Sequence, residues 1–174
     1  MPSPSSTTAQ LSSEPPGPVA RNVQRFGLLV LCLVVVAAAA GLLGPREGRV
    51  ADRTGGYALV VDHPAITRAG QPAPLHIKVH QQGGFDGPIT LALSRDLFDD
   101  SDFQTWYPTP SAETAEPERI IYEFDPPPGG EDFEVHLDAR TAPGQFGEIS
   151  RNTVTLLVDD EPAVQVDFRV WRMP

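Results

Sequence analysis

The sequence predicts an all-β domain, an antiparallel sandwich of about seven strands, preceded by one transmembrane helix. Three observations lead to this prediction. Near the N-terminus there is one long uncharged apolar run, in several later runs apolar and polar residues alternate, and between those runs lie clusters of Gly, Pro and Asp. Alternation with period two places the apolar side chains of a strand on one face, which is typical of a sheet with one buried and one wet side.

The apolar run extends over nineteen residues, from Phe26 to Gly44, without a charge, an Asn, Gln or His, or a Pro. A helix of this length measures about 28 Å, close to the ~30 Å of bilayer hydrocarbon. A core helix of a soluble protein would show polar residues at helical period on one face, and this run shows none. We therefore predict a transmembrane helix at 26–44.

A cleaved signal peptide is the alternative. The small residues Ala37 to Ala40 are of the kind that precede a cleavage site. The apolar run continues beyond them through Leu43, further than the usual apolar region of a signal peptide, which is about 7–15 residues long. The sequence therefore favours an uncleaved anchor.

The arginines that flank the run are nearly balanced in number, so they give little information about orientation. The order of the segments resembles that of an exported protein, and long domains cross membranes largely regardless of their own charge. We expect the C-terminal domain outside the cytoplasm. Residues 1–25, rich in Pro and Ser, are predicted to be a disordered tail, 45–55 a juxtamembrane linker and 56–174 the sandwich domain.

Seven runs in the last segment have strand character and are separated by turn-forming sequences. The clearest alternate apolar and polar residues, as in Leu75–Val79 and Val164–Val170. The seven are residues 57–61, 75–79, 89–93, 119–124, 133–137, 153–158 and 164–170, with turn sequences at 83–88, 125–130, 142–147 and 159–162. Seven short strands in about 120 residues favour a sandwich of immunoglobulin-like type.

The stretch DFEVHLDARTAPGQFGEI, Asp132 to Ile149, resembles the late strands of bacterial immunoglobulin-like and fibronectin-like modules. The whole chain is also similar, in its use of Ala, Gly, Pro, Val and Arg, to small single-span membrane proteins of high-GC bacteria. The resemblance implies a sandwich fold and an adhesive or scaffolding habit, and it carries over no catalytic residue. The Cys and Trp pattern of antibody domains is absent from the sequence.

The domain is strongly acidic. From Ala51 to Pro174 there are nine Lys and Arg against twenty-one Asp and Glu, a formal charge of −12, and Lys78 is the only lysine of the chain. Phosphate backbones and anionic headgroups would repel such a charge, so we expect no nucleic-acid partner and no domain lying flat on a membrane. Cys32 is the only cysteine, which excludes an intramolecular disulfide and a cysteine-based zinc site.

No catalytic motif occurs in the sequence, and we predict no enzyme, no cofactor, no small-molecule substrate and no metal site. His76 and His80 share one face of a predicted strand but are about 13 Å apart. A metal site would need the register of another strand to bring His136 beside them. The acidic run from Asp96 to Asp102 lacks the spacing of a calcium loop, so we interpret it as a solvated loop.

Four aromatic residues are the predicted contacts of a protein partner: Phe103, Trp106, Tyr107 and Trp171. Aromatic rings give large contact area at low entropic cost, and the first three lie between an acidic and a Pro-rich stretch. The alternative is that these rings cover an edge of the sandwich. The sequence thus predicts a membrane-anchored binding or assembly module. A second hypothesis is an accessory subunit of a membrane complex, recognised through its transmembrane helix.

Overall fold

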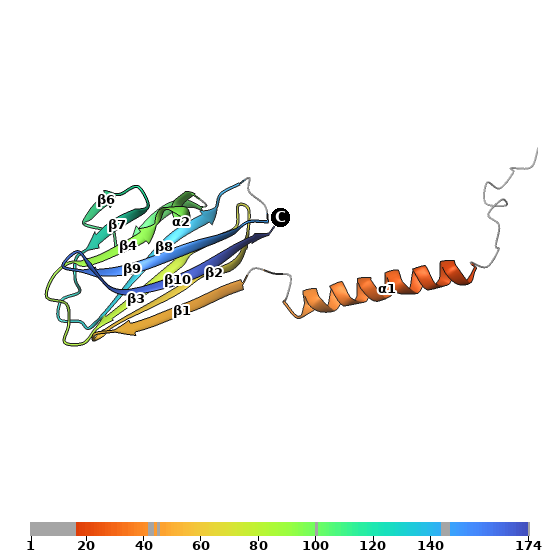
Figure 1. The fold of residues 1–174 in the computed structure, drawn as a ribbon, viewed down its shortest axis with the longest axis horizontal. Helices are drawn as coiled ribbons and strands as arrows, with labels where there is room; N and C mark the ends of the chain where they lie inside the picture. The colour runs from red at the N-terminus through yellow and green to blue at the C-terminus, as the bar shows by residue number, and fades with distance from the viewer. Residues whose placement is uncertain (1–16, 42–43, 45, 100, 144–146, 174) are drawn as a thin grey trace, which may run out of the picture. The chain divides into compact units, whose positions relative to one another are not determined.

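The computed structural model describes residues 17–41, 44, 46–99, 101–143 and 147–173, without the side chains of residues 103 and 104. It contains two compact units, residues 1–44 and 45–174. The described part of the first unit is one helix, and that of the second is mainly β structure (Figure 1). The predicted mainly β domain preceded by an apolar helix is therefore confirmed.

Helix α1 spans Pro18–Ala39, so it begins eight residues before the predicted start at Phe26. Pro18 occupies the first turn, where its missing N–H costs no hydrogen bond. The helix ends before the predicted Gly44 because Gly41 adopts a positive φ of 69° and donates its N–H to the carbonyl of Ala38, which terminates helices. Residues 18–25, predicted as tail, are thus helical, and residues 1–16 lie outside the described part.

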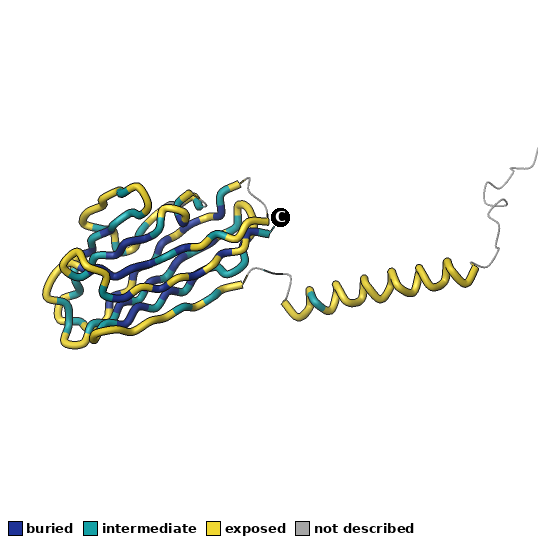
Figure 2. Tube along the Cα trace, viewed as in Figure 1, coloured by how far each residue is buried: buried dark blue, intermediate teal, exposed yellow. Residues whose placement is uncertain are grey.

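By length and composition α1 can cross a membrane. Its described side chains are almost all exposed to the surroundings, as Figure 2 shows. Apolar residues cover every side of the helix between Phe26 and Ala39. A helix that is apolar on every side has the composition that membrane-spanning helices show.

Ten strands and one short helix make up the described part of the β domain. They are β1 (Arg46–Thr54), β2 (Tyr57–Arg68), β3 (Leu75–Gln81), β4 (Ile89–Ser94), α2 (Arg95–Asp99), β5 (Ser101–Tyr107), β6 (Ala112–Ala115), β7 (Arg119–Phe124), β8 (Asp132–Thr141), β9 (Ile149–Val158) and β10 (Glu161–Met173). All seven predicted strands are present, several of them longer than expected. Strands β1, β5 and β6 were not predicted, because they lack a clear alternation of apolar and polar residues.

The strands form one curled sheet in the order β5-β8-β3-β2-β10-β9-β4-β7-β6, with β1 added beside β2. Most neighbours are antiparallel, but the last three residues of β10 pair in parallel with Ile66–Arg68 of β2. Strand β2 pairs with β3 through residues 57–62 and with β10 through its end, so it joins both parts of the sheet. This single curled sheet of mixed strands differs from the expected pair of purely antiparallel sheets.

The inner faces of the curled sheet enclose one apolar core. Twenty buried residues belong to it, among them Leu59 and Val61 of β2, Leu91 of β4 and Phe124 of β7, none of which exposes any surface. Burial of this apolar surface is the main stabilising contribution to the fold. The buried residues of β8 and β10 alternate with exposed ones, as the sequence predicts.

Residues 46–54, predicted as a linker, form strand β1 along the edge of β2. The two strands pair over their whole length, from Arg46 opposite Ile66 to Thr54 opposite Tyr57, and the turn between them uses Gly55 and Gly56 at positive φ. Val50 packs against the core. Strand β1 could not be predicted from its sequence, because only one of its apolar side chains, Val50, packs against the core.

A substitution at Gly48 of β1 can test whether this strand packs on the rest of the domain. A Cβ at this position would lie 2.7 Å from the ring of His63, which is buried and stacked on Phe168 at 4.4 Å between centroids. Gly48→Ala is expected to lower the free energy of unfolding by about 1–3 kcal/mol, the usual cost of overpacking. Far-UV circular dichroism of the full chain in detergent, followed through urea unfolding, measures it.

The matched control is Gly87→Ala, because nothing lies within 4 Å of a Cβ built at Gly87 and its φ is not positive. The control is expected to change the free energy of unfolding by less than about 0.5 kcal/mol. Equal stability of the two variants would contradict the packing of β1 on the domain.

Candidate functional site

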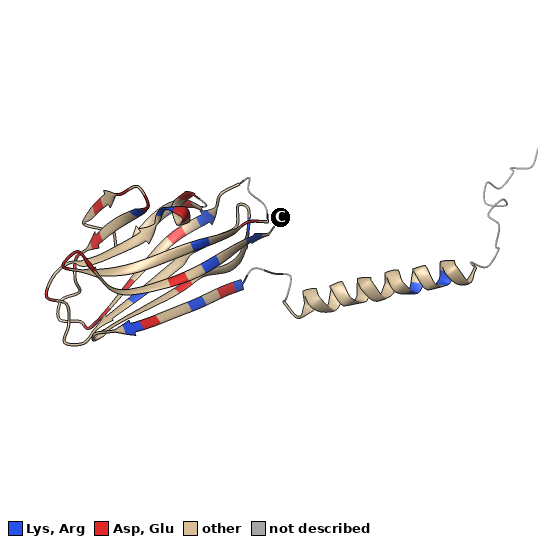
Figure 3. Ribbon diagram, viewed as in Figure 1, with Lys and Arg blue, Asp and Glu red and all other residues tan. Residues whose placement is uncertain are grey.

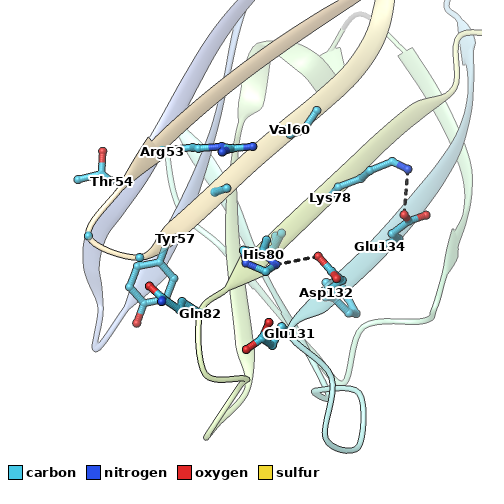
Figure 4. Close-up of a pocket in the computed structure, with 15 residues that line it drawn as sticks. Arg53, Thr54, Tyr57, Val60, Lys78, His80, Gln82, Glu131, Asp132 and Glu134 are labelled. Atoms are coloured by element: carbon cyan, nitrogen blue, oxygen red, sulfur yellow. Dashed lines mark hydrogen bonds and ion pairs between the residues drawn. The ribbon is translucent and has the colours of Figure 1, made fainter.

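The outer surface of strands β1, β2, β3 and β8 is the candidate site, and we call it the polar face. Its side chains are those that alternate with the core residues of the same strands. An open hollow of about 900 Å³ lies on it, and Figure 4 shows its lining. The labelled residues there are Arg53, Thr54, Tyr57, Val60, Lys78, His80, Gln82, Glu131, Asp132 and Glu134.

Opposite charges on neighbouring strands are paired across the hollow. The Nζ of Lys78 lies 2.9 Å from Oε1 of Glu134, and Nδ1 of His80 lies 2.9 Å from Oδ1 of Asp132 (Figure 4). In both pairs the residues are direct partners in the β3–β8 register. These pairs are exposed, so each contributes little to stability, and the polar face keeps its charges accessible to a partner.

A row of five side chains crosses the polar face from strand to strand. The registers place Arg49 opposite Asp62, Asp62 opposite His76, His76 opposite His136 and His136 opposite Tyr107. Arg49 donates two hydrogen bonds to the carboxylate of Asp62, and the Arg49 guanidinium lowers the pKa of that carboxyl. The row therefore runs from the guanidinium of Arg49 and the carboxylate of Asp62, through two imidazoles, to the phenol of Tyr107.

The two imidazoles of this row are in contact. The ring centroids of His76 and His136 are 4.3 Å apart with the rings nearly perpendicular, so the register does bring His136 beside His76. The Nε2 atom of His136 lies 4.0 Å from Oε2 of Glu134. Within the described residues, however, no group of three or more His, Cys, Asp or Glu is arranged to hold a metal ion.

The predicted aromatic contacts are placed on different parts of the sheet. Tyr107 exposes 75% of its surface at the end of β5, beside the polar face. Trp106 points the other way and packs on Tyr122 and Phe124, with ring centroids 4.6 and 5.7 Å away. Trp171 is 40% exposed on β10, three strands from β8 in the sheet order. The side chain of Phe103 lies outside the described part.

Trp106 belongs to an aromatic cluster that covers one side of the core. Tyr122 is buried beneath it, and this burial raises the pKa of the Tyr122 phenol to about 12. Phe124 continues the cluster to Phe133 of β8 at 5.4 Å between centroids. The sequence alone did not show that Trp106 faces the core while Tyr107 faces solvent. Which positions of β5 point inward depends on how this strand pairs with β8.

The described residues of the acidic run lie in a short helix and at the start of a strand, and Asp100 is outside the described part. Asp96 and Asp99 lie in α2, which is five residues long, and Asp102 lies in β5. Leu97 of the same helix is buried and belongs to the core. The segment is therefore a structured cap on the sheet rather than the loop that we expected.

The fourth histidine, His63, lies inside the domain. It is 6% exposed, and its Nδ1 lies 3.2 Å from the carbonyl oxygen of Pro64. Burial lowers the pKa of His63 because the charged imidazolium loses its hydration. The domain thus holds three half-buried histidines on the polar face and one buried histidine whose pKa is lowered.

Comparisons with known proteins give no family. No family model matches the chain, and no curated protein matches it. One solved structure, of AvmM, which catalyses macrocyclisation in alchivemycin A biosynthesis, is 15% identical, with 73% of this chain and 98% of that chain covered and a TM-score of 0.36. Another, the DNA glycosylase AlkC of Pseudomonas fluorescens bound to DNA, is 13% identical, with 62% and 28% covered and a TM-score of 0.32. These scores carry no argument about function.

His63 gives a prediction for the dependence of stability on pH. Its pKa in the folded state is below the unfolded value of about 6.5, so the unfolded chain binds more protons as the pH falls below that value. Stability is therefore expected to be full above about pH 6.5 and to decline on acidification. Urea unfolding of the full chain in detergent, compared at pH 7.5 and pH 5.5, measures the decline.

The variant His63→Phe keeps a ring against Phe168 and removes the titrating group. It is expected to lose part of the decline between pH 7.5 and pH 5.5. His80→Phe, at an exposed position, is the control and should leave the decline in place. An unchanged decline in His63→Phe would show that other groups cause it.

Proposed function

We propose that this chain is a single-span membrane protein that displays its β domain outside the cytoplasm as a protein-binding or assembly module. The helix α1 supports the anchoring, since it is long and apolar enough to cross a bilayer. The observation that carries the binding function is Tyr107. This residue is 75% exposed on the edge strand β5, and an aromatic side chain there offers contact area at low entropic cost.

The surroundings of Tyr107 suit a protein partner. Strand β5 pairs with β8 and is the first strand in the sheet order, so it forms an edge that a partner strand can approach. His136 lies directly opposite Tyr107 on β8, and the paired charges of the polar face lie further along β8 and β3. An aromatic anchor beside a polar, charge-bearing surface is the usual composition of a transient protein interface.

For the fold we propose an immunoglobulin-like sandwich that is closed on one side. The support is the path of β2, which leaves β3 after Asp62 and joins β10 in parallel from Ile66. A strand that changes partners in this way can contribute to two packed layers. The stretch from Asp132 to Ile149, which resembles late strands of such modules, includes β8.

The alternative function is an accessory subunit of a membrane complex that is recognised through α1. The exposed apolar side chains on every side of this helix favour it, because such a surface can pack on other transmembrane helices as well as on lipid. Exchanging α1 for an unrelated span separates the two functions. Loss of the partner after this exchange supports the accessory subunit, and retention supports the module.

Tyr107 and its neighbour Trp106 provide the test of the module. Tyr107→Ala is expected to leave the free energy of unfolding within about 0.5 kcal/mol of the parent while abolishing capture of the partner. Trp106→Ala is expected to lower the free energy of unfolding by about 3 kcal/mol, because it opens a cavity above Tyr122. Detergent co-purification with mass spectrometry measures capture, and urea unfolding measures stability.

Thr105→Ala is the matched control for Tyr107→Ala. Thr105 is exposed on the same strand, two positions away, and is expected to be dispensable for capture. A partner that is retained by Tyr107→Ala at parental levels would contradict the proposed surface.

The side of the membrane is tested by labelling. Thr114 is exposed on the edge strand β6, and Cys32 is the only native cysteine. In a Cys32→Ser background, Thr114→Cys is expected to react with a membrane-impermeant maleimide in intact cells. Labelling only after lysis would place the domain in the cytoplasm and contradict the proposed localisation.

A further inference from the structure

One end of the sheet carries a row of apolar side chains on its outer surface, which we call the Trp171 row. In the β ladders Trp171 lies opposite Ile149 of β9 and opposite Ile66 of β2. Trp171 and Ile149 expose 40% and 58% of their surface, and Ile66 is half-buried. Large apolar side chains that are exposed side by side mark an interaction surface.

The next outward row consists of two arginines, the arginine pair. Arg151 and Arg169 lie directly opposite each other in the β9–β10 ladder, and both are exposed. Arg151 follows Ile149 by two positions and Arg169 precedes Trp171 by two, so the two rows are about 7 Å apart. Among the described residues neither has an ion-pair partner. Like charges in direct opposition repel, so an anion above the pair would stabilise it.

Acidic loops gather at one end of the sheet, whereas the end that carries the Trp171 row has arginines together with carboxylates. The ladders place the start of β1, the end of β2, the start of β9 and the end of β10 at the end that carries the Trp171 row. Figure 3 shows arginines of β8, β9 and β10 toward this end, which the label C marks, and acidic loops at the opposite end. Acidic residues at the opposite end are Asp86, Asp125, Glu131, Asp159, Asp160 and Glu161.

Because the charges are unevenly distributed, the net charge of −12 does not describe every part of the surface. The arginine end also contains carboxylates. Glu116 and Glu148 are each bound to an arginine of that end, Arg119 and Arg172. Asp96, Asp99 and Glu118 line a hollow together with Arg151, and Asp167, two positions before Arg169, accepts a hydrogen bond from Thr153. An anionic surface would be repelled by the opposite end and attracted to the arginine pair. The sequence-based expectation of repulsion from anionic lipid therefore does not apply to every part of the surface.

We propose that the Trp171 row and the arginine pair dock on the surface of an anionic phospholipid bilayer. Tryptophan is enriched at the headgroup level of membranes, and arginine binds phosphate oxygens. The row continues to Arg46, which lies opposite Ile66 and follows the last residue of α1, Ala39, by only seven positions in the sequence. A free anion would use the arginine pair but not the apolar row. The proposal rests on the proposed membrane anchoring.

The test uses the full chain in nanodiscs and the emission of Trp171. The chain has two tryptophans, so Trp106→Phe leaves Trp171 as the only reporter. In nanodiscs of phosphatidylcholine and phosphatidylglycerol brominated near the headgroup, Trp171 emission is expected to be quenched. Because each arginine near an anionic surface contributes about fivefold to binding, the double variant R151Q/R169Q is expected to weaken docking by more than tenfold and to lose most of the quenching.

Two controls keep the result specific. R53Q removes a positive charge at the opposite end of the sheet and is expected to leave the quenching unchanged. If Trp106→Phe does not fold, the difference between the parent and Trp171→Phe gives the same emission. Nanodiscs of phosphatidylcholine alone are expected to reduce the quenching as the double variant does.

The outcomes separate the two proposals. A chain that does not co-elute with nanodiscs overturns the anchoring, and the docking with it. A chain that co-elutes but shows unquenched Trp171 emission overturns the docking alone. Quenching that is equal with and without the arginine pair, or with and without anionic lipid, also overturns it.

Discussion

The β domain depends on strand β2, which pairs with three neighbours, β1, β3 and β10. Its first half lies beside β3 and its last residues lie beside β10, and the ten described strands belong to one hydrogen-bonded sheet. Leu59 and Val61 lie in the first half of β2 and expose no surface. Because backbone pairing and apolar burial are fixed by the same strand, the curl of the sheet, the core and the outer surface are set together.

The two outer surfaces follow from this arrangement. Alternation sends every second side chain outward, and the registers then bring outward residues from distant parts of the chain into rows. Arg49, Asp62 and His76 become neighbours on one part of the sheet, and Ile66, Trp171 and Ile149 on another. In each row the chemistry belongs to the combination rather than to any one residue.

The sequence was informative where local physics decides the structure. Alternation in β8 and β10 located both strands and identified which side chains face the core, and Val170 inward with Trp171 outward follows from it. The absence of charge from Phe26 onward identified a helix that can span a bilayer. The sequence was not informative for β1. Most side chains of this strand face water, so it shows no regular alternation of apolar and polar residues.

Composition and periodicity alone therefore determined an apolar helix, a mainly β domain, its acidic charge and most of its strands. Only the tertiary structure decided that residues 46–54 join the sheet, that Trp106 packs on Tyr122 while Tyr107 remains in water, and that His136 meets His76. It also decided that Arg151 and Arg169 lie opposite each other beside Trp171. The physical reason is that periodicity acts between residues two positions apart, whereas register is set by pairing between segments far apart in the chain.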